Sequence, residues 1–189
     1  MIKQLFILLV ATFNIVGSNA QNLKNFLGST PQPITGQDWK MLTSAQKPLI
    51  VIFFSPECPI CISNTLPLRE IIEKNTGKVD IALVFPGDYY SDKKIKQFQS
   101  KYKLEVSALR DSKNDLVKFL NAKVTPEVYL FDQTRTLVYS GKLNNQYESV
   151  GVRRGVVTEN YLSDAISSTL LGKSPLVKTT QAVGCFINK

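Results

Sequence analysis

The chain has 189 residues, of which 43% are hydrophobic, 20% charged and 10% aromatic, as is typical of a folded protein with one domain. Lysine and arginine (23) exceed aspartate and glutamate (15), which gives a net charge of +8, and the chain contains no histidine. The missing histidine excludes Ser-His-Asp hydrolases, Cys-His proteases and histidine-ligated zinc or copper sites. The three cysteines are therefore the most informative residues for function.

Residues 1–20 have the pattern of a cleaved signal peptide. Lys3 precedes a mostly apolar run over 5–16, and Ser-Asn-Ala at 18–20 forms a cleavage site with small outer residues. The apolar run is shorter than the roughly 20 residues that a membrane-spanning helix needs, so an uncleaved anchor is the weaker alternative. We expect a protein that is exported, is not embedded in a membrane and resides where disulfides persist.

The positive charge is expected to be a solvated surface. Lysines gather within 93–103, on a predicted helix, where such a group usually faces water. A nucleic-acid site would need a focused basic stripe with interleaved aromatic residues, and an exported protein rarely meets nucleic acid. We therefore expect no nucleic-acid partner.

The mature chain is predicted to form a single domain with two flanking segments. Residues 21–47 are rich in turn-forming residues and are predicted to be an N-terminal extension that packs on the domain through Trp39. The domain is predicted over 48–172, and 173–189 is predicted to be a C-terminal tail that contains Cys185. The sequence shows no internal repeat or linker that would divide this domain.

Apolar runs alternate with amphipathic segments along the predicted domain. Two runs, 49–54 and 80–85, are almost entirely apolar, which is typical of strands buried on both faces of a sheet. Pro67 is expected to bend the first helix or to begin its regular part. The order of elements predicts an α/β fold with a mixed β-sheet covered by helices on both faces. Strands are predicted at 49–54, 80–85, 105–109, 128–131 and 137–140, the last two as a hairpin, and helices at 60–75, 91–102, 114–121 and 159–171.

The motif Cys-Pro-Ile-Cys at 58–61 lies where a buried strand meets a helix. Half of a zinc site has the same spacing, but there is no histidine and only one further cysteine to complete it. A c-type haem would need a histidine directly after Cys61, where Ile62 stands. We therefore expect neither a metal nor another bound cofactor.

The position of the motif favours redox chemistry. Backbone N–H groups and the positive dipole end at the start of a helix stabilise a thiolate on Cys58. Cys61, one turn later, is more shielded and can attack a mixed disulfide formed by Cys58. We interpret Cys58 as the nucleophile and Cys61 as the resolving thiol. The alternative is an inert disulfide between the two, although so short a loop constrains the unfolded chain very little.

Thr125-Pro126 comes directly before a predicted strand. The cis form of an X-Pro bond costs only about 0.5–1 kcal/mol. The residues themselves leave both an ordinary proline and a cis proline open at this position.

Three segments resemble the exported, peroxiredoxin-related redoxin-domain proteins of bacteria, within the thioredoxin-like superfamily. The segments are FFSPECPICISNTLPL, VTPEVYLFDQTRTLVYSGKLNNQY and RRGVVTENYLSDAISSTLLGKSPLVKTTQAVGCFI, and the resemblance covers residues 39–187. It implies a thioredoxin-like fold in which a cis Pro126 stands beside the cysteine pair. It also implies that the backbone of Thr125 pairs with a substrate chain as an added strand and holds its disulfide near Cys58.

The resemblance implies a periplasmic thiol:disulfide oxidoreductase that acts on protein thiols or disulfides without a cofactor. A redox protein of the membrane is a further candidate partner. The direction of electron transfer cannot be read from the spacer Pro-Ile.

The chain departs from the thioredoxin pattern around the motif. Glu57 stands where that pattern has tryptophan, and Ile52 stands where it has a buried acid. Glu57 and Glu127 are our candidates for assisting proton transfer at Cys61, the alternative being two surface carboxylates near a cleft. A carboxylate beside Cys58 would also oppose thiolate formation.

Two other functions stay open. A thiol peroxidase of the peroxiredoxin type would use Ser55 in place of the threonine in PxxxTxxC, but Val51 replaces the proline and no arginine can be assigned the activating role. A non-catalytic adaptor would hold a partner during assembly of envelope proteins or cytochromes.

Cys185 has no assigned partner in the sequence. It could be a small buried apolar residue, or it could pair with another chain. In a third interpretation the tail returns to the active-site face, where Cys185 exchanges with the cysteine pair.

Overall fold

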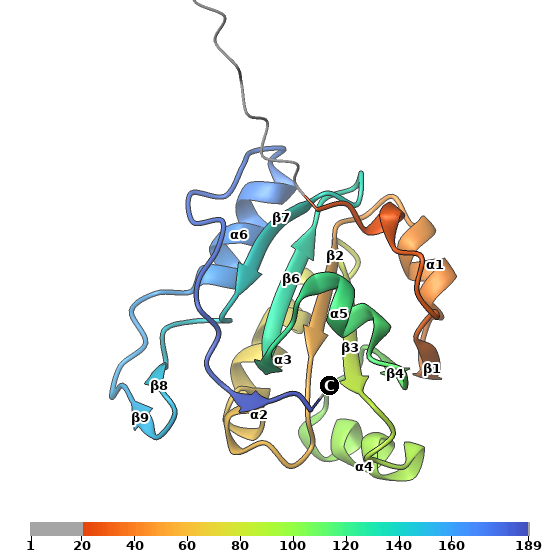
Figure 1. The fold of residues 1–189 in the computed structure, drawn as a ribbon. Helices are drawn as coiled ribbons and strands as arrows, with labels where there is room; N and C mark the ends of the chain where they lie inside the picture. Colours follow the sequence, from red (N-terminus) through yellow and green to blue (C-terminus); the bar gives the residue numbers. More distant parts are fainter. Residues whose placement is uncertain (1–20, 189) are drawn as a thin grey trace, which may run out of the picture.

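The computed structural model describes residues 21–188, and their central element is a six-stranded sheet (Figure 1). The predicted signal peptide lies outside the described residues. Three adjacent strands are parallel and the remaining neighbours are antiparallel, so the predicted mixed sheet is confirmed. The order is β1-β4-β3-β2-β6-β7, formed by β1 (Gln32–Thr35), β4 (Ser107–Asp111), β3 (Asp80–Pro86), β2 (Leu49–Phe53), β6 (Glu127–Phe131) and β7 (Leu137–Gly141).

The central strand β2 is buried on both faces, as its apolar sequence predicts. Successive side chains of a strand point to opposite faces, so Ile50 and Ile52 join one core cluster and Val51 and Phe53 join the other. Every residue of β2 is buried, which explains why this strand contains no polar residue.

Helices cover both faces of the sheet, which confirms the predicted layering (Figure 1). Apolar residues recur at helical spacing in each helix and face the sheet. On one face lie α3 (Thr65–Asn75), α4 (Asp92–Tyr102) and α6 (Tyr161–Leu170), and on the other lie α1 (Trp39–Ser44) and α5 (Asp115–Leu120).

The predicted helix over 60–75 is two helices in the structure. A short helix α2 (Pro59–Ser63) ends at Asn64, and α3 begins at the next residue. Pro67 lies in the first turn of α3, which begins at Thr65. A backbone N–H there has no helical partner in any case, so the proline is accommodated close to the start of the regular helix, near one of the two places expected for it.

The segment 21–47 contributes to the sheet itself, beyond the predicted packing of Trp39. Trp39 is buried in the core cluster that includes α5. In addition β1 pairs antiparallel with β4 and forms one edge of the sheet. The run Gln-Pro-Ile-Thr gave no strand signal because it is short and contains a proline, which strands accept mainly at edges.

Two small two-stranded sheets complete the fold. β8 (Tyr147–Ser149) pairs with β9 (Val152–Arg153) in a hairpin. β5 (Val124–Thr125) pairs with β10 (Cys185–Phe186), which brings the C-terminal tail back against the domain (Figure 1). A short 3₁₀ helix, η1 (Leu23–Asn25), lies near the start of the described chain, and no helix within residues 21–188 is long and apolar enough to cross a membrane.

Candidate active site

Cys58 lies at the junction of β2 and α2, as the sequence predicts. It is the N-cap residue of α2, with Pro59 at the first helical position, and its carbonyl accepts a hydrogen bond from Ile62 N–H at 2.9 Å. Its own N–H donates to the Ser55 carbonyl at 3.4 Å, which closes the turn between strand and helix. The turn and the helix together fix the direction in which the Cys58 side chain leaves the backbone.

Cys58 forms a disulfide with Cys185, which is 127 residues later in the chain. The two Cα atoms are 6.0 Å apart, a usual separation for bridged cysteines. Of the three interpretations of Cys185, the structure has the one in which the tail returns to the active-site face. Cys61 is a free thiol, so the inert Cys58–Cys61 brace is not formed in this structure.

The tail reaches Cys58 as an added strand. Cys185 pairs with Thr125 in the antiparallel β5–β10 ladder, and Ile187 N–H donates to the Lys123 carbonyl at 2.9 Å. Gly184 passes so close that a Cβ on it would overlap the carbonyl oxygen of Thr125. Only glycine therefore fits at this point of the tail.

Thr125 contacts both sulfur atoms of the motif. Its carbonyl oxygen lies 3.1 Å from Cys58 Sγ, which has no proton to donate while it is in the disulfide. The Thr125 hydroxyl hydrogen bonds to Cys61. The Thr125–Pro126 peptide bond is cis. The structure thus brings Cys58 and Cys61 next to Thr125 and Pro126, although Thr125 follows Cys61 by 64 residues in the sequence.

Cys61 is completely buried and is a poor thiolate at neutral pH. Burial raises the pKa of the Cys61 thiol to about 12, because a charged sulfur loses its hydration there. The Ser55 N–H, 3.4 Å from Cys61 Sγ, and the Thr125 hydroxyl act in the opposite direction. Cys61 therefore has the shielded position predicted for it and two donors that favour its ionised form.

Glu57, directly before Cys58, points into solvent and forms an ion pair with Lys94. The Lys94 ammonium also lies 5.1 Å from the centre of the Tyr90 ring. The positive charge of Lys94 offsets the carboxylate that the sequence places beside Cys58. The sequence predicted for Lys94 only a solvated helix face and gave no role to Tyr90, because both lie on another segment, α4 and the loop before it.

Glu127 holds the backbone next to Thr125. Its carboxylate accepts hydrogen bonds from the N–H groups of Lys123 and Val124, at 2.8 and 3.2 Å, and from the Tyr129 hydroxyl at 3.0 Å. These bonds fix the start of β5, against which the tail pairs. No hydrogen bond joins Glu57 or Glu127 to Cys61 in the described structure, so their observed contacts are a surface ion pair and a loop anchor.

A pocket of about 370 Å³ lies beside the disulfide. Aromatic side chains from the segment before α4 form one wall and the tail forms another, and the Ser55 hydroxyl is 3.0 Å from the Tyr90 hydroxyl. No arginine is among the described residues that line this pocket. The lining residues are Phe54, Ser55, Glu57, Cys58, Pro86, Tyr89, Tyr90, Lys94, Thr125, Cys185, Phe186, Ile187 and Asn188.

Arg110 and Arg135 are engaged with groups other than the residues that line this pocket. Arg110 forms ion pairs with Asp92 and Asp88, at 2.6 and 3.8 Å. Arg135 is buried and donates to backbone carbonyls around the end of α1. The geometry therefore does not favour the peroxidase alternative, which needs an arginine at the nucleophile to orient peroxide.

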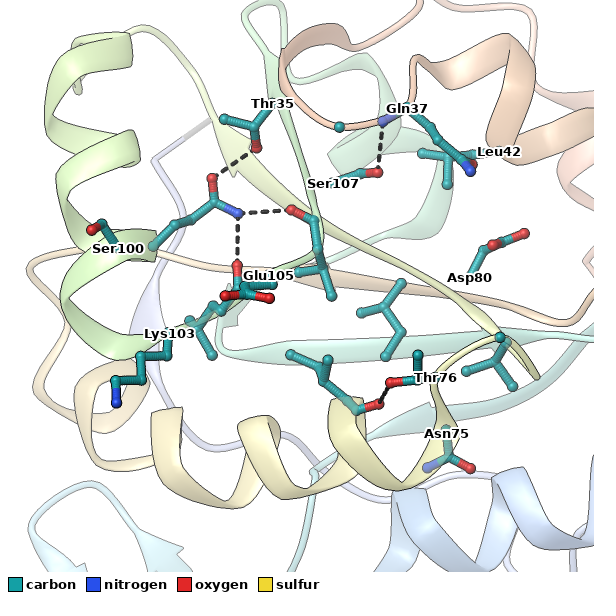
Figure 2. A pocket seen from close by; sticks show the side chains of 18 of the residues that line it. Thr35, Gln37, Leu42, Asn75, Thr76, Asp80, Ser100, Lys103, Glu105 and Ser107 are labelled. Atoms are coloured by element: carbon teal, nitrogen blue, oxygen red, sulfur yellow. Dashed lines mark hydrogen bonds between the residues drawn. The ribbon is translucent and has the colours of Figure 1, made fainter.

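A larger hollow, of about 610 Å³, lies at the other end of β3 (Figure 2). It contains no cysteine, and its central side chain, Gln99, is fully hydrogen bonded. The Gln99 amide accepts from the Thr35 hydroxyl at 2.8 Å and donates to the carbonyls of Leu104 and Val106 at 3.1 and 2.8 Å. These bonds connect β1 with α4 and the loop after it, so the polar groups of this hollow stabilise the packing of the fold. Within residues 21–188 no group of three or more cysteine or acidic side chains is arranged to hold a metal ion.

A sequence model of the family described as Redoxin matches residues 15–155. Among curated proteins, no sequence matches this chain. Solved structures with the same fold include an uncharacterised conserved protein from Geobacillus kaustophilus, with 19% identity and a TM-score of 0.72 over 85% of this chain and 87% of that one. A hypothetical protein from Sinorhizobium meliloti 1021 has 21% identity and a TM-score of 0.72 over 84% and 89% of the two chains.

A thiol-disulfide isomerase from Corynebacterium glutamicum has 15% identity and a TM-score of 0.59, over 80% of this chain and 97% of that one. At these identities the structural likeness establishes the fold alone. The fold is thioredoxin-like, with the mixed sheet and two helical layers in one domain.

Proposed function

Because the chain belongs to the Redoxin family, we propose that it is a thiol:disulfide oxidoreductase that exchanges disulfides with other proteins through Cys58 and Cys61. The observation that carries this proposal is the Cys58–Cys185 disulfide, formed with an extended segment that pairs with Thr125. A mixed disulfide with a partner protein needs the same geometry, namely a cysteine on an added strand next to Cys58.

In the first step the Cys58 thiolate attacks one sulfur of a partner disulfide. A bond forms between Cys58 Sγ and that sulfur, the partner's S–S bond breaks, and the second partner sulfur leaves with the electron pair and takes up a proton. The backbone N–H groups at the start of α2 favour the negative charge on Cys58, and the ammonium of Lys94 offsets the neighbouring Glu57 carboxylate.

In the second step Cys61 resolves the mixed disulfide. Its thiolate attacks Cys58 Sγ, the bond to the partner breaks, and the partner leaves as a thiol while Cys58–Cys61 becomes the oxidised pair. The Ser55 N–H and the Thr125 hydroxyl stabilise the Cys61 thiolate as it forms. The reverse sequence oxidises a partner dithiol, and the redox poise of the compartment sets the direction.

We further propose that the exchange takes place outside the cytoplasm, in the periplasm. The signal-peptide pattern at 1–20 supports export, and a disulfide such as Cys58–Cys185 persists in an oxidising compartment. The exchange itself requires no cofactor, since electrons pass between sulfur atoms.

Reduction of insulin by dithiothreitol, followed as turbidity, tests the proposal. The wild-type chain is expected to speed precipitation, and Cys58→Ser is expected to abolish this effect. The double variant Cys61→Ser, Cys185→Ser keeps the nucleophile and removes the two thiols that could displace a partner, so it is expected to accumulate a covalent adduct with insulin at Cys58.

The same samples separate the alternatives. Saturable consumption of hydroperoxide without insulin reduction would support a peroxidase in place of our proposal. Inactivity in both assays, together with tight non-covalent capture of a partner by Cys58→Ser, would support the adaptor.

A further inference from the structure

The tail places a third cysteine at the site where a partner cysteine would react. Cys185 is bonded to Cys58, and β10 occupies the edge of β5 that an added strand would use. Thr125 contacts both cysteines of the motif, so the free thiol of Cys61 and the bridged sulfur of Cys58 lie against the same residue. The arrangement has the connectivity of a mixed disulfide in which the partner segment belongs to the same chain.

We propose that Cys185 is a third redox-active cysteine and that the tail is a resident partner segment, which leaves when the disulfide moves from Cys58–Cys185 to Cys58–Cys61. This inference rests on the proposed exchange function, because it uses Cys61 as the resolving thiol. It assigns to Cys185 a part in the reaction cycle, and to the segment 184–188 control over access to Cys58.

The transfer is an isomerisation with no net oxidation. The Cys61 thiolate attacks Cys58 Sγ, a Cys58–Cys61 bond forms, and the Cys58–Cys185 bond breaks. The electron pair leaves with the Cys185 sulfur, which takes up the proton that Cys61 released. No external oxidant or reductant is needed.

The contacts of the tail outside the disulfide are all non-covalent. Beyond the β5–β10 pairs, Ile187 N–H donates to the Lys123 carbonyl and the Asn188 carbonyl accepts from the Asn114 side chain at 3.1 Å. Phe186 is 85% exposed, so the docked strand contributes little apolar burial at its centre. Once the disulfide has moved, these bonds and the packing of Val183 and Ile187 against the two core clusters hold the tail, and its undocking makes the edge of β5 available to a partner segment.

Until then the tail competes strongly with partners. A tethered segment competes at an effective concentration in the millimolar range for short flexible links. The tail is also anchored upstream, where Thr180 N–H donates to the Ser140 carbonyl at 2.9 Å and the Tyr139 and Thr180 hydroxyls lie 2.9 Å apart. Undocking can therefore be confined to the residues that follow Thr180.

Gly184 offers a way to weaken docking without changing a sulfur atom. A Cβ at residue 184 would overlap the Thr125 carbonyl oxygen, so Gly184→Ala cannot keep the β5–β10 register. Gly155 is the matched control, since a Cβ there meets no atom within 4 Å and its backbone is not in the left-handed region.

The test is disulfide mapping by mass spectrometry after acid quench of full-length protein equilibrated in a glutathione buffer. In the wild type we expect both Cys58–Cys185 and Cys58–Cys61, and in Cys61→Ser only Cys58–Cys185. Gly184→Ala is expected to lower the ratio of Cys58–Cys185 to Cys58–Cys61 at least tenfold, and Gly155→Ala to leave it unchanged. Hydrogen exchange of the amides in 181–188 is expected to quicken in parallel.

The inference is overturned if Cys58–Cys185 is missing from both the wild type and Cys61→Ser, or if Gly184→Ala leaves the ratio as it was. Insulin reduction reports separately on the proposed function. Wild-type activity with no Cys58–Cys185 bond would retain the function and reject the role of the tail. A Cys58–Cys185 bond in a chain with no activity on insulin would retain the internal exchange and reject the general oxidoreductase.

Discussion

The two ends of the six-stranded sheet differ in how their polar and reactive groups are satisfied. At the end near the start of β3, Gln99 and Ser107 of the larger hollow are hydrogen bonded, and Asp80 keeps one buried carboxylate oxygen without a hydrogen-bond partner. Nearby Arg135 donates to the carbonyls of Leu42, Thr43, Ala45 and Lys47. At the other end, Cys58 is held by a bond to a segment 127 residues away that can be exchanged.

The difference shows that a hollow does not by itself mark the functional end of this molecule. The hollow in Figure 2 has a larger volume than the pocket beside the disulfide. Its hydrogen bonds join Thr35 of β1 to Gln99 of α4 and the turn after β1 to Ser107 of β4, so these groups stabilise the fold. The smaller pocket is lined by Cys58 at the start of α2, by its partner Cys185 and by Thr125 of β5. If the comparison is correct, substitutions at one end change chemistry and those at the other change stability.

Cys58→Ser is expected to have the largest effect on activity. A hydroxyl is a far weaker nucleophile than a thiolate at neutral pH, so the rate of insulin reduction should fall on the order of 1,000-fold or more. Thermal unfolding followed by circular dichroism, in reducing buffer for both proteins, should change little. A variant that is inactive because it is unfolded would weaken the distinction between the two ends.

Arg135→Met is expected to have the largest effect on stability. The side chain is 1% exposed, and its loss leaves buried carbonyls at the end of α1 without donors. The free energy of unfolding should fall by about 3–5 kcal/mol in urea titrations. Arg154→Met, which breaks an exposed ion pair with Glu148, is the control and should cost under about 1 kcal/mol. The alkylation rate of Cys58 in the folded, reduced Arg135→Met protein should match the wild type.

Resolution by Cys61 is expected to accelerate with pH. Because the pKa of Cys61 is raised to about 12, the thiolate fraction below that value grows about tenfold for each pH unit. The release of glutathione from a Cys58–glutathione adduct, measured by stopped flow on Cys185→Ser protein, should therefore accelerate about tenfold per unit between pH 7 and 9. A plateau in this range would mean that Cys61 ionises readily, contrary to its burial.

Lys94→Gln is expected to have the smallest effect. Removing the ammonium leaves Glu57 unpaired beside Cys58, which disfavours the thiolate. Since the pair is exposed, alkylation of Cys58 in the reduced protein should slow only about twofold at low salt. Glu57→Gln should have the opposite effect, and 1 M salt should remove both differences. A salt-independent change would indicate a structural effect instead.

The sequence predicted the sulfur end well where the signal was local. The apolar run of β2 and the motif at its end predicted the strand and the helix that starts at Cys58, because burial and helix geometry act over a few residues. The hairpin of β6 and β7 was equally readable from its alternation about a turn.

Contacts between segments that are distant in the chain were harder to predict from the sequence. The pairing of Cys185 with Cys58 was one of three open interpretations, since a disulfide partner depends on the path of the tail. Gly184 next to Cys185 was the available sign of a close backbone approach. Glu127 illustrates the reverse case, in which a carboxylate singled out for chemistry anchors Lys123 and Val124.

Mapping the covalent adduct formed between reduced Cys61→Ser protein and insulin tests most directly that Cys58 is the atom that meets the partner. The account predicts one intermolecular disulfide, from Cys58 to an insulin cysteine, with Cys185 present as a free thiol. Adducts that form only through Cys185, or no adduct from a folded and fully reduced chain, would contradict it.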